Sequence, residues 1–159
     1  MPLSDQLLFL LDLNGSGQET DMLLDAFASL SSFLAERELA HRVLYWQPQA
    51  QQFQCREISQ ASDLLPLWQE VLASGRGAAL PILKEEFLPT GISRGLYVCC
   101  SPQTQPLLVL KDCYPSARLT VIQTAPLQEE ESLEKRFAGI SQIVLETGKT
   151  AQNLTGVTL

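Results

Sequence analysis

Blocks of hydrophobic and polar residues follow one another along the chain and predict strands and helices in turn. Residues 7–11 (LLFLL) are apolar without interruption and end in the polar, glycine-bearing loop 12–17, a pattern typical of a strand buried on both faces of a parallel sheet. Residues 20–38 predict an amphipathic helix, because apolar side chains recur there at helical spacing: Leu23, Phe27, Leu30 and Leu34.

An antiparallel hairpin is predicted next. Residues 42–46 (RVLYW) form a second apolar run, and after Pro48 residues 52–58 (QFQCREI) alternate polar and apolar side chains, as a half-exposed strand does. Two strands joined by so short a connection run antiparallel. We therefore expect residues 52–58 to lie at an edge of the sheet.

The rest of the chain continues the alternation of helix and strand. Residues 62–73 predict a helix with Ser59 or Ser62 as its N-cap, whereas residues 74–94 show no clear period, and residues 78–83 fit either a strand or a helix. The later pattern predicts strand 95–100 (GLYVCC), helix 105–114, strand 117–124, helix 129–138, strand 140–146 and an irregular tail from about 147. We find no linker, which favours one domain over residues 1–159.

Alternating strands and helices predict a doubly wound α/β fold. Its sheet is expected to be mostly parallel, with helices on both faces and one antiparallel edge strand. Ligands of such folds bind at the carboxyl ends of the strands, near the point where the strand order reverses. Here that edge would be formed by loops 12–17, 101–103 and 124–126.

The overall charge and hydropathy exclude some classes of partner. Across 159 residues the formal net charge is −7, and no cluster of Lys and Arg is present, which argues against nucleic-acid binding. No apolar run approaches the roughly 20 residues that a membrane span needs. The start of the chain lacks the basic residues and the cleavage site of a signal peptide, so we expect a cytoplasmic location.

The cysteines and the single histidine give little support to metal or nucleophilic chemistry. Cys55, Cys99, Cys100 and Cys113 lack the paired spacing of a metal site and are expected to be free thiols. Neighbours in one strand point to opposite faces, so Cys99 and Cys100 should not face each other. Because His41 is the one histidine, a His-rich metal site is excluded and a Ser-His-Asp triad is not favoured.

The first strand, loop and helix carry a resemblance to a known family. Residues 7–36 (LLFLLDLNGSGQETDMLLDAFASLSSFLAE) resemble the corresponding part of von Willebrand factor A domains, whose loop has the pattern Asp-x-Ser-x-Ser, and the later elements follow in the same order. The chain is similar in particular to the C-terminal domain of a bacterial family of unknown function. That resemblance implies a longer, membrane-anchored parent protein associated with MoxR-type ATPases, as an alternative to a free cytoplasmic protein.

The resemblance also implies a metal-ion-dependent adhesion site, which this chain matches only in part. Asp12 and Ser16 agree with the first loop, and Asn14 replaces its first serine. The second loop should fall at residues 75–77, which offer Arg76 but no threonine, with Thr90 as an alternative. Ser101 stands where the third loop carries an aspartate. Because Mg²⁺ prefers charged oxygen ligands, we expect no bound metal, and Asp12, Asn14 and Ser16 stay the candidates should one bind.

We therefore predict a non-catalytic, metal-independent protein-interaction module with no cofactor. The partner, another protein, would contact the loop residues Asp12, Asn14, Gly15, Ser16, Ser101 and Gln103. Four alternatives stay open: a Mg²⁺-dependent protein-binding domain using Asp12 and Ser16; an enzyme using those two residues or the thiol of Cys99 or Cys100; a phosphate site at Gly15-Ser16-Gly17; and a switch domain of the response-regulator type.

Overall fold

The computed structural model describes residues 6–15, 17–73, 80–124 and 140–145. Several of the features expected from the sequence lie outside these ranges: Ser16, the second metal loop at 75–77, the helix at 129–138 and the tail from 147.

A six-stranded sheet with the order β3-β2-β1-β4-β5-β6 organises the described residues. Every neighbouring pair runs parallel except β2 and β3, which are antiparallel. The strands are β1 (Leu7–Asp12), β2 (His41–Gln47), β3 (Gln52–Ile58), β4 (Arg94–Cys99), β5 (Arg118–Gln123) and β6 (Ile140–Val144). The predicted doubly wound α/β fold, with the first strand in the interior of the sheet and an antiparallel strand at its edge, is confirmed.

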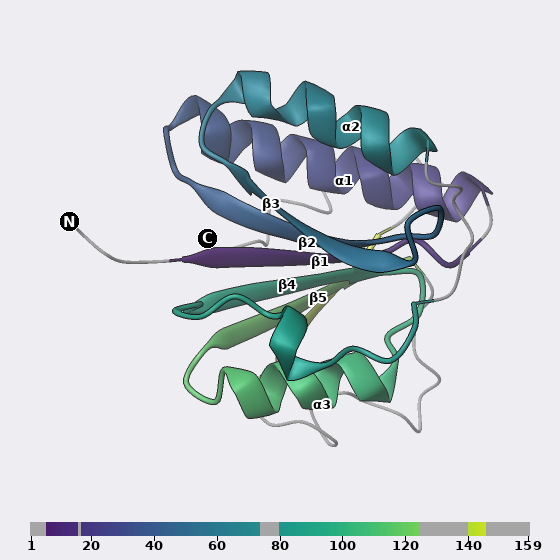
Figure 1. The fold of residues 1–159 in the computed structure, drawn as a ribbon, viewed down its shortest axis with the longest axis vertical. Helices are drawn as coiled ribbons and strands as arrows, with labels where there is room; N and C mark the ends of the chain where they lie inside the picture. The colour runs from purple at the N-terminus through teal and green to yellow at the C-terminus, as the bar shows by residue number, and fades with distance from the viewer. Residues whose placement is uncertain (1–5, 16, 74–79, 125–139, 146–159) are drawn as a thin grey trace.

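Helices cover both faces of this sheet. Figure 1 shows α1 (Gly17–Glu36) and α2 (Leu64–Ala73) side by side over one face and α3 (Thr104–Cys113) on the other. The first helix ends earlier than predicted, because Glu38 adopts a φ of 58° and Leu39 N donates a hydrogen bond of 2.9 Å to Leu34 O. A residue in the left-handed region directly after the last turn is a common helix terminator.

Two local expectations between β3 and β4 are wrong. The turn that leads into α2, η1 (Ala61–Asp63), has Gln60 at its N-cap and not Ser59 or Ser62. The carboxylate of Asp63 accepts hydrogen bonds from Ser59 N at 2.9 Å and from Gln60 N at 3.2 Å. Residues 80–83 are neither strand nor helix. The backbone of Leu83 bonds instead to the side-chain amide of Gln105, at 3.0 Å through its N–H and 2.8 Å through its carbonyl.

The central strand divides the core into two halves. Leu7, Phe9 and Leu11 point towards α1 and α2, whereas Leu8 and Leu10 point towards α3. All five are buried, and Phe9 has no exposed surface. Residues 7–11 are therefore all apolar for the reason that the sequence predicts: a strand inside a sheet covered on both sides contacts a core on each face.

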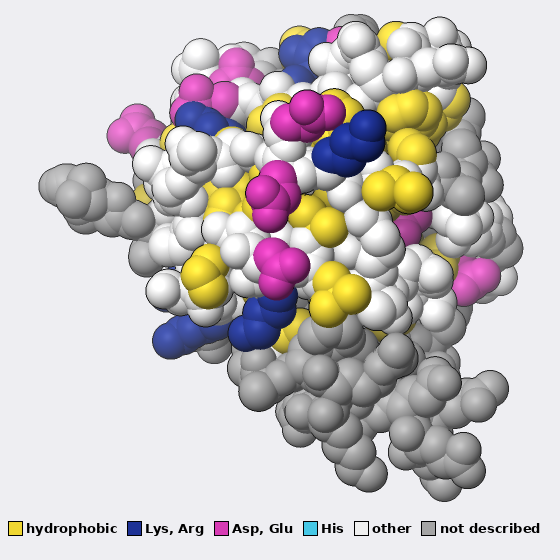
Figure 2. Space-filling model, turned by 60° about the horizontal axis from the view of Figure 1, so that its bottom comes forward, with side chains coloured by type: hydrophobic (Ala, Val, Ile, Leu, Met, Phe, Trp, Pro, Cys, Tyr) yellow, Lys and Arg dark blue, Asp and Glu magenta, His cyan; other side chains and the backbone are white. Residues whose placement is uncertain are grey.

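One face of the molecule has a mixed surface. On the face shown in Figure 2, apolar side chains stand in small groups between acidic and basic ones. Within the described ranges, no helix combines the length and the hydrophobicity that crossing a bilayer requires.

Candidate functional site

The strand order reverses between β1 and β4. From β1 the chain passes through α1 to β2 on one side, and β4 lies on the other side of β1 with α3 following it on the opposite face (Figure 1). The loops that leave β1 and β4 therefore diverge at the carboxyl ends of these strands. Ligand sites of doubly wound folds lie at such a point, which makes this edge the candidate site.

Asp12, at the end of β1, lies at the centre of this edge. Its Oδ2 accepts a hydrogen bond of 2.9 Å from the hydroxyl of Tyr97, and its Oδ1 accepts one of 3.4 Å from Asn14 N. Only 4% of Asp12 is exposed. Burial raises the pKa of the Asp12 carboxyl, and the two hydrogen bonds offset part of that rise. Asp12 is thus a buried carboxylate that neutral donors stabilise.

Tyr97 is a residue of this site that the sequence interpretation missed. It lies fully buried in β4, and its hydroxyl also accepts a hydrogen bond of 3.4 Å from Gln103 N, in the loop before α3. Tyr97 therefore connects Asp12 to the loop after β4. Burial first, and then the negative charge of neighbouring groups, raises the pKa of the Tyr97 hydroxyl, so it stays a hydrogen-bond donor at neutral pH. The only sequence signal was a phenol within an otherwise apolar strand.

The predicted partner-binding residues that the structure describes gather around this buried pair. Asn14, Gly15, Ser101 and Gln103 are exposed at the same edge, and Gln103 Nε2 donates a hydrogen bond of 3.1 Å to Ser101 O. Ser16 lies outside the described residues. The carboxyl edge thus combines a buried acid with a rim of exposed, uncharged polar groups.

Close packing also joins the loop after β1 to the end of β4. A Cβ atom built on Gly15 would lie 2.2 Å from Cys100 Sγ and 3.1 Å from Cys100 Cβ. The close contact with Cys100 therefore explains why a glycine stands at position 15. A phosphate bound at the Gly15 backbone is not needed to explain it. Beside Gly15, the Thr124 hydroxyl lies 3.1 Å from Glu19 Oε2 and 3.4 Å from Cys100 O, so the residue directly after β5 also contributes to the edge.

The metal ligands that the resemblance implies are not brought together among the described residues. No group of three or more His, Cys, Asp or Glu side chains within those ranges could hold a metal ion. Thr90, the alternative ligand from a second loop, lies at the other end of the sheet, close to the residues that lead into β4 and β5. Asp12 and the exposed Asn14 and Ser101 are the described counterparts of the adhesion-site ligands.

The thiols at this edge are poor nucleophiles. Cys99 and Cys100 are free and buried, and they belong to opposite halves of the core, as their adjacent positions predict. Burial raises the pKa of both thiols, and the nearby Asp12 carboxylate adds to the rise. A thiol with a raised pKa is protonated at neutral pH and reacts slowly. Cys55 and Cys113 are also free.

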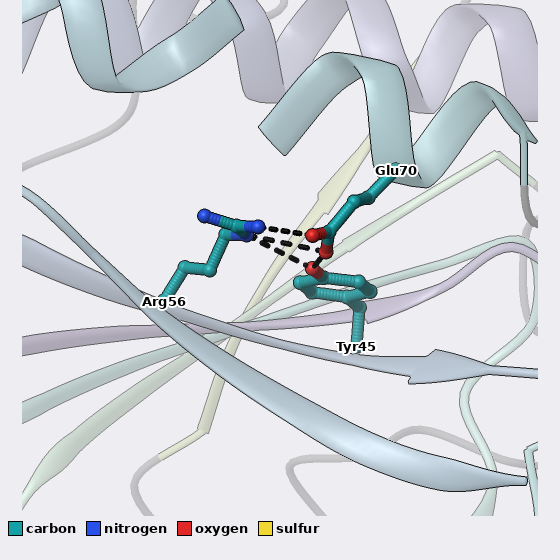
Figure 3. Close-up of polar contacts among 3 residues, drawn as sticks. All are labelled: Tyr45, Arg56 and Glu70. Atoms are coloured by element: carbon teal, nitrogen blue, oxygen red, sulfur yellow. Dashed lines mark hydrogen bonds and ion pairs between the residues drawn. The ribbon is translucent and has the colours of Figure 1, made fainter. Parts of the chain in front are cut away.

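A second polar cluster lies between the edge hairpin and α2 (Figure 3). The Glu70 carboxylate accepts hydrogen bonds from the Tyr45 hydroxyl and from Arg56, with which it forms an ion pair. Burial and the Glu70 carboxylate raise the pKa of Tyr45 to about 12. Arg56 and Glu70 keep 37% and 30% of their side chains exposed, so water screens the pair. The cluster holds α2 against β2 and β3, which is a structural role.

The described residues also form an open pocket of about 520 Å³ between the end of α3 and the segment that precedes β4. Tyr114 and Pro89 both line this pocket, and the Tyr114 hydroxyl donates a hydrogen bond of 2.5 Å to Pro89 O. Glu85, Asp112 and Cys113 line the pocket among apolar residues. It lies away from the Asp12 edge and contains none of the residues that the sequence singled out for binding, apart from Thr90.

Comparison of the chain with family models, with curated proteins and with solved structures finds no significant match.

Proposed function

We propose that this chain is a non-catalytic protein-interaction domain of the von Willebrand factor A type, which binds a partner protein at the carboxyl edge of its sheet without a metal ion. The observation that supports this most is the state of Asp12. Its carboxylate is 4% exposed and already accepts hydrogen bonds from Tyr97 and from Asn14 N. The exposed groups around it are the ones free to meet a partner.

The assignment to the von Willebrand factor A type rests on the resemblance of residues 7–36 and on the order of the elements that follow. We infer a non-catalytic role from the chemistry of the groups at the site. Asp12 is the buried acid of the site, and the thiols of Cys99 and Cys100 are protonated. General acid–base chemistry needs a group that reaches the substrate with a pKa near the working pH. The other described carboxylate at this edge, that of Glu19, accepts a hydrogen bond from the Thr124 hydroxyl, and we propose no catalytic role for it.

The location and the partner belong to the same proposal. Four free cysteines suit a reducing compartment, so we place the domain in the cytoplasm or on a membrane-anchored parent protein. The partner surface is expected to be polar, because the exposed rim consists of Asn14, Gly15, Ser101 and Gln103.

The proposal is tested by affinity capture with a matched pair of baits. One bait carries Asn14→Arg and Ser101→Arg at the carboxyl edge, and the control carries Ser62→Arg and Ser116→Arg, both also exposed, at the other end of the sheet. Proteins captured by the wild-type and control baits should be lost with the carboxyl-edge bait. Equal capture by all three baits would reject the carboxyl edge as the binding surface.

The same captures repeated with a chelator distinguish the Mg²⁺-dependent alternative. Binding through a metal at Asp12 and Ser16 would be lost when divalent ions are removed. We expect capture to be unchanged by the chelator.

A further inference from the structure

The edge strand β3 presents an open line of backbone groups. It is the outermost strand beside β2, and its seven residues pair one-to-one with β2 from Gln47↔Gln52 to His41↔Ile58, without a bulge. It contains no proline. Among the backbone hydrogen bonds that join described residues outside the regular elements, none involves residues 52–58. As far as the described part of the chain goes, the outer edge of β3 is therefore open to another strand.

Charge does not protect this edge. Natural proteins commonly block an open edge with lysine, proline, a bulge or a covering segment. The Arg56 side chain is directed towards Tyr45 and Glu70 of the same chain, which leaves Glu57 as the other charged residue of β3. Cys55, at the middle of the strand, is exposed. A seven-residue edge of this kind favours pairing with a further strand.

We propose that a second copy of this chain pairs antiparallel with β3 about a two-fold axis at Cys55, which joins the two sheets into one. Cys55 has three strand residues on each side, so two copies overlap along the whole strand in this register. Directly opposite residues would then be Gln54 and Arg56, Phe53 and Glu57, and Gln52 and Ile58, each pair formed twice. No like charges face each other across the axis.

Other symmetric registers are less favourable. In an antiparallel pair whose two-fold axis is perpendicular to the sheet, one residue faces its own copy. An axis at Arg56 or Glu57 would place two like charges opposite each other, which is destabilising. An axis at Gln54 or Phe53 would shorten the overlap of the two strands. This match of the strand to itself favours a second copy over an unrelated extended peptide.

This interface is separate from the carboxyl-edge loops, so its failure would leave the proposed function untouched. Sedimentation of the full chain over a range of concentrations tests it. Wild-type protein and Cys55→Ser should both show a reversible monomer–dimer equilibrium. Cys55→Lys and Cys55→Glu each place two like charges on the axis, and each alone should weaken the dimer by roughly tenfold or more.

An equimolar mixture of Cys55→Lys and Cys55→Glu should restore dimerisation, because opposite charges then face each other across the axis. This recovery also distinguishes a lost interface from a misfolded variant. Monomers at every concentration of wild-type protein, or a dimer that neither charged variant weakens, would overturn the proposal.

A cross-linking measurement checks the register. Cβ atoms of residues directly opposite each other in an antiparallel pair lie about 4.5–5.5 Å apart. When diamide is added, the Cys55 thiols of two copies should each give up a proton and an electron to it and form one disulfide. A Cys113→Ser variant should give the same covalent dimer, and Cys55→Ser should give none. A dimer that is cross-linked through Cys113 instead would contradict the register.

Discussion

The Tyr97 hydroxyl donates a hydrogen bond of 2.9 Å to Asp12 Oδ2 and so joins β4 to β1 where the strand order reverses. The proposed resemblance would make Asp12 a metal ligand, but one of its carboxylate oxygens is already bonded to Tyr97 inside the protein. The other oxygen accepts a hydrogen bond from Asn14 N. A carboxylate held in this way supports the loop around it, which is the role that we assign to Asp12.

Tyr97→Phe should destabilise the fold by about 1–3 kcal/mol at neutral pH, because the buried Asp12 carboxylate loses its side-chain donor. The pKa of Asp12 is already raised, and loss of this donor raises it further. The deficit should therefore shrink as the pH falls through the raised pKa, since a protonated carboxyl is easier to bury. Urea unfolding over a pH series measures both effects.

Tyr114→Phe is the matched control for that experiment. Tyr114 also donates from its hydroxyl, but its acceptor is the neutral carbonyl of Pro89. Its stability deficit should stay constant over the same pH range. A Tyr97→Phe deficit that is equally constant would show that the charge of Asp12 is not involved.

The sequence was enough to predict elements whose pattern is set by burial. Residues 7–11 had to be an interior strand because both faces are apolar, and β3 had to be an edge because its polar and apolar residues alternate. Phe9→Ala should therefore cost about 3–5 kcal/mol in the free energy of unfolding. Phe9 has no exposed surface and packs edge-on against Phe27, with ring centroids 5.1 Å apart.

The control for Phe9→Ala is Phe33→Ala, because Phe33 is 45% exposed on α1. We expect this variant to cost well under half as much in the same urea titration. Similar losses for the two variants would contradict the central position of β1 in the core.

What the sequence could not supply are contacts between residues far apart in the chain. Tyr97 lies 85 residues from Asp12, and Gln105 lies 22 residues from Leu83. No local period signals a side chain that reaches another element. The N-cap of the turn before α2 was misassigned for a related reason. The N–H groups of Ser59 and Gln60 bond back to the carboxylate of Asp63, and only the geometry shows which side chain they reach.

Gly15→Ala tests the packing between the loop and β4. The new methyl group would lie 2.2 Å from Cys100 Sγ, so either the loop or the end of β4 has to move. We expect a loss of about 1–3 kcal/mol, in the range typical of overpacking. Combining it with Cys100→Ala removes the sulfur and should recover part of the loss. If the loss in the double variant equals the sum of the two single losses, this contact is not the cause.

Protonation of His41 should make the stability of the fold depend on pH below about 6.5. Its Nε2 lies 2.6 Å from Ser31 Oγ and its Nδ1 lies 3.1 Å from Leu39 O, in a buried position. Burial lowers its pKa from 6.5, and the hydrogen bond to Leu39 O offsets part of that change. Because the unfolded chain binds the proton more tightly, stability should fall as the pH drops below about 6.5, until the lowered pKa is reached.

Unfolding experiments on His41→Gln identify this contribution. The variant is less stable near neutral pH but should lose the part of the pH dependence that begins at about 6.5. Since His41 is the one histidine of the chain, no other imidazole can mask the change. An unchanged pH profile in the variant would show that His41 titrates alike in the folded and unfolded states.

Divalent metal should leave the melting temperature unchanged. Asp12 is buried and bonded to Tyr97, and Ser101 supplies no charge where von Willebrand factor A domains have an aspartate. Mg²⁺ would therefore have to give up hydration water for largely neutral oxygens. An ion that binds only the folded state would stabilise it by about 2.7 kcal/mol at a hundredfold excess over its dissociation constant. Such a gain would raise the melting temperature by several degrees.

We expect no rise in melting temperature in millimolar Mg²⁺ or Mn²⁺ relative to protein in chelator. A rise that Asp12→Asn abolishes would instead favour the Mg²⁺-dependent interaction, because the amide keeps the shape of the side chain and removes only its charge.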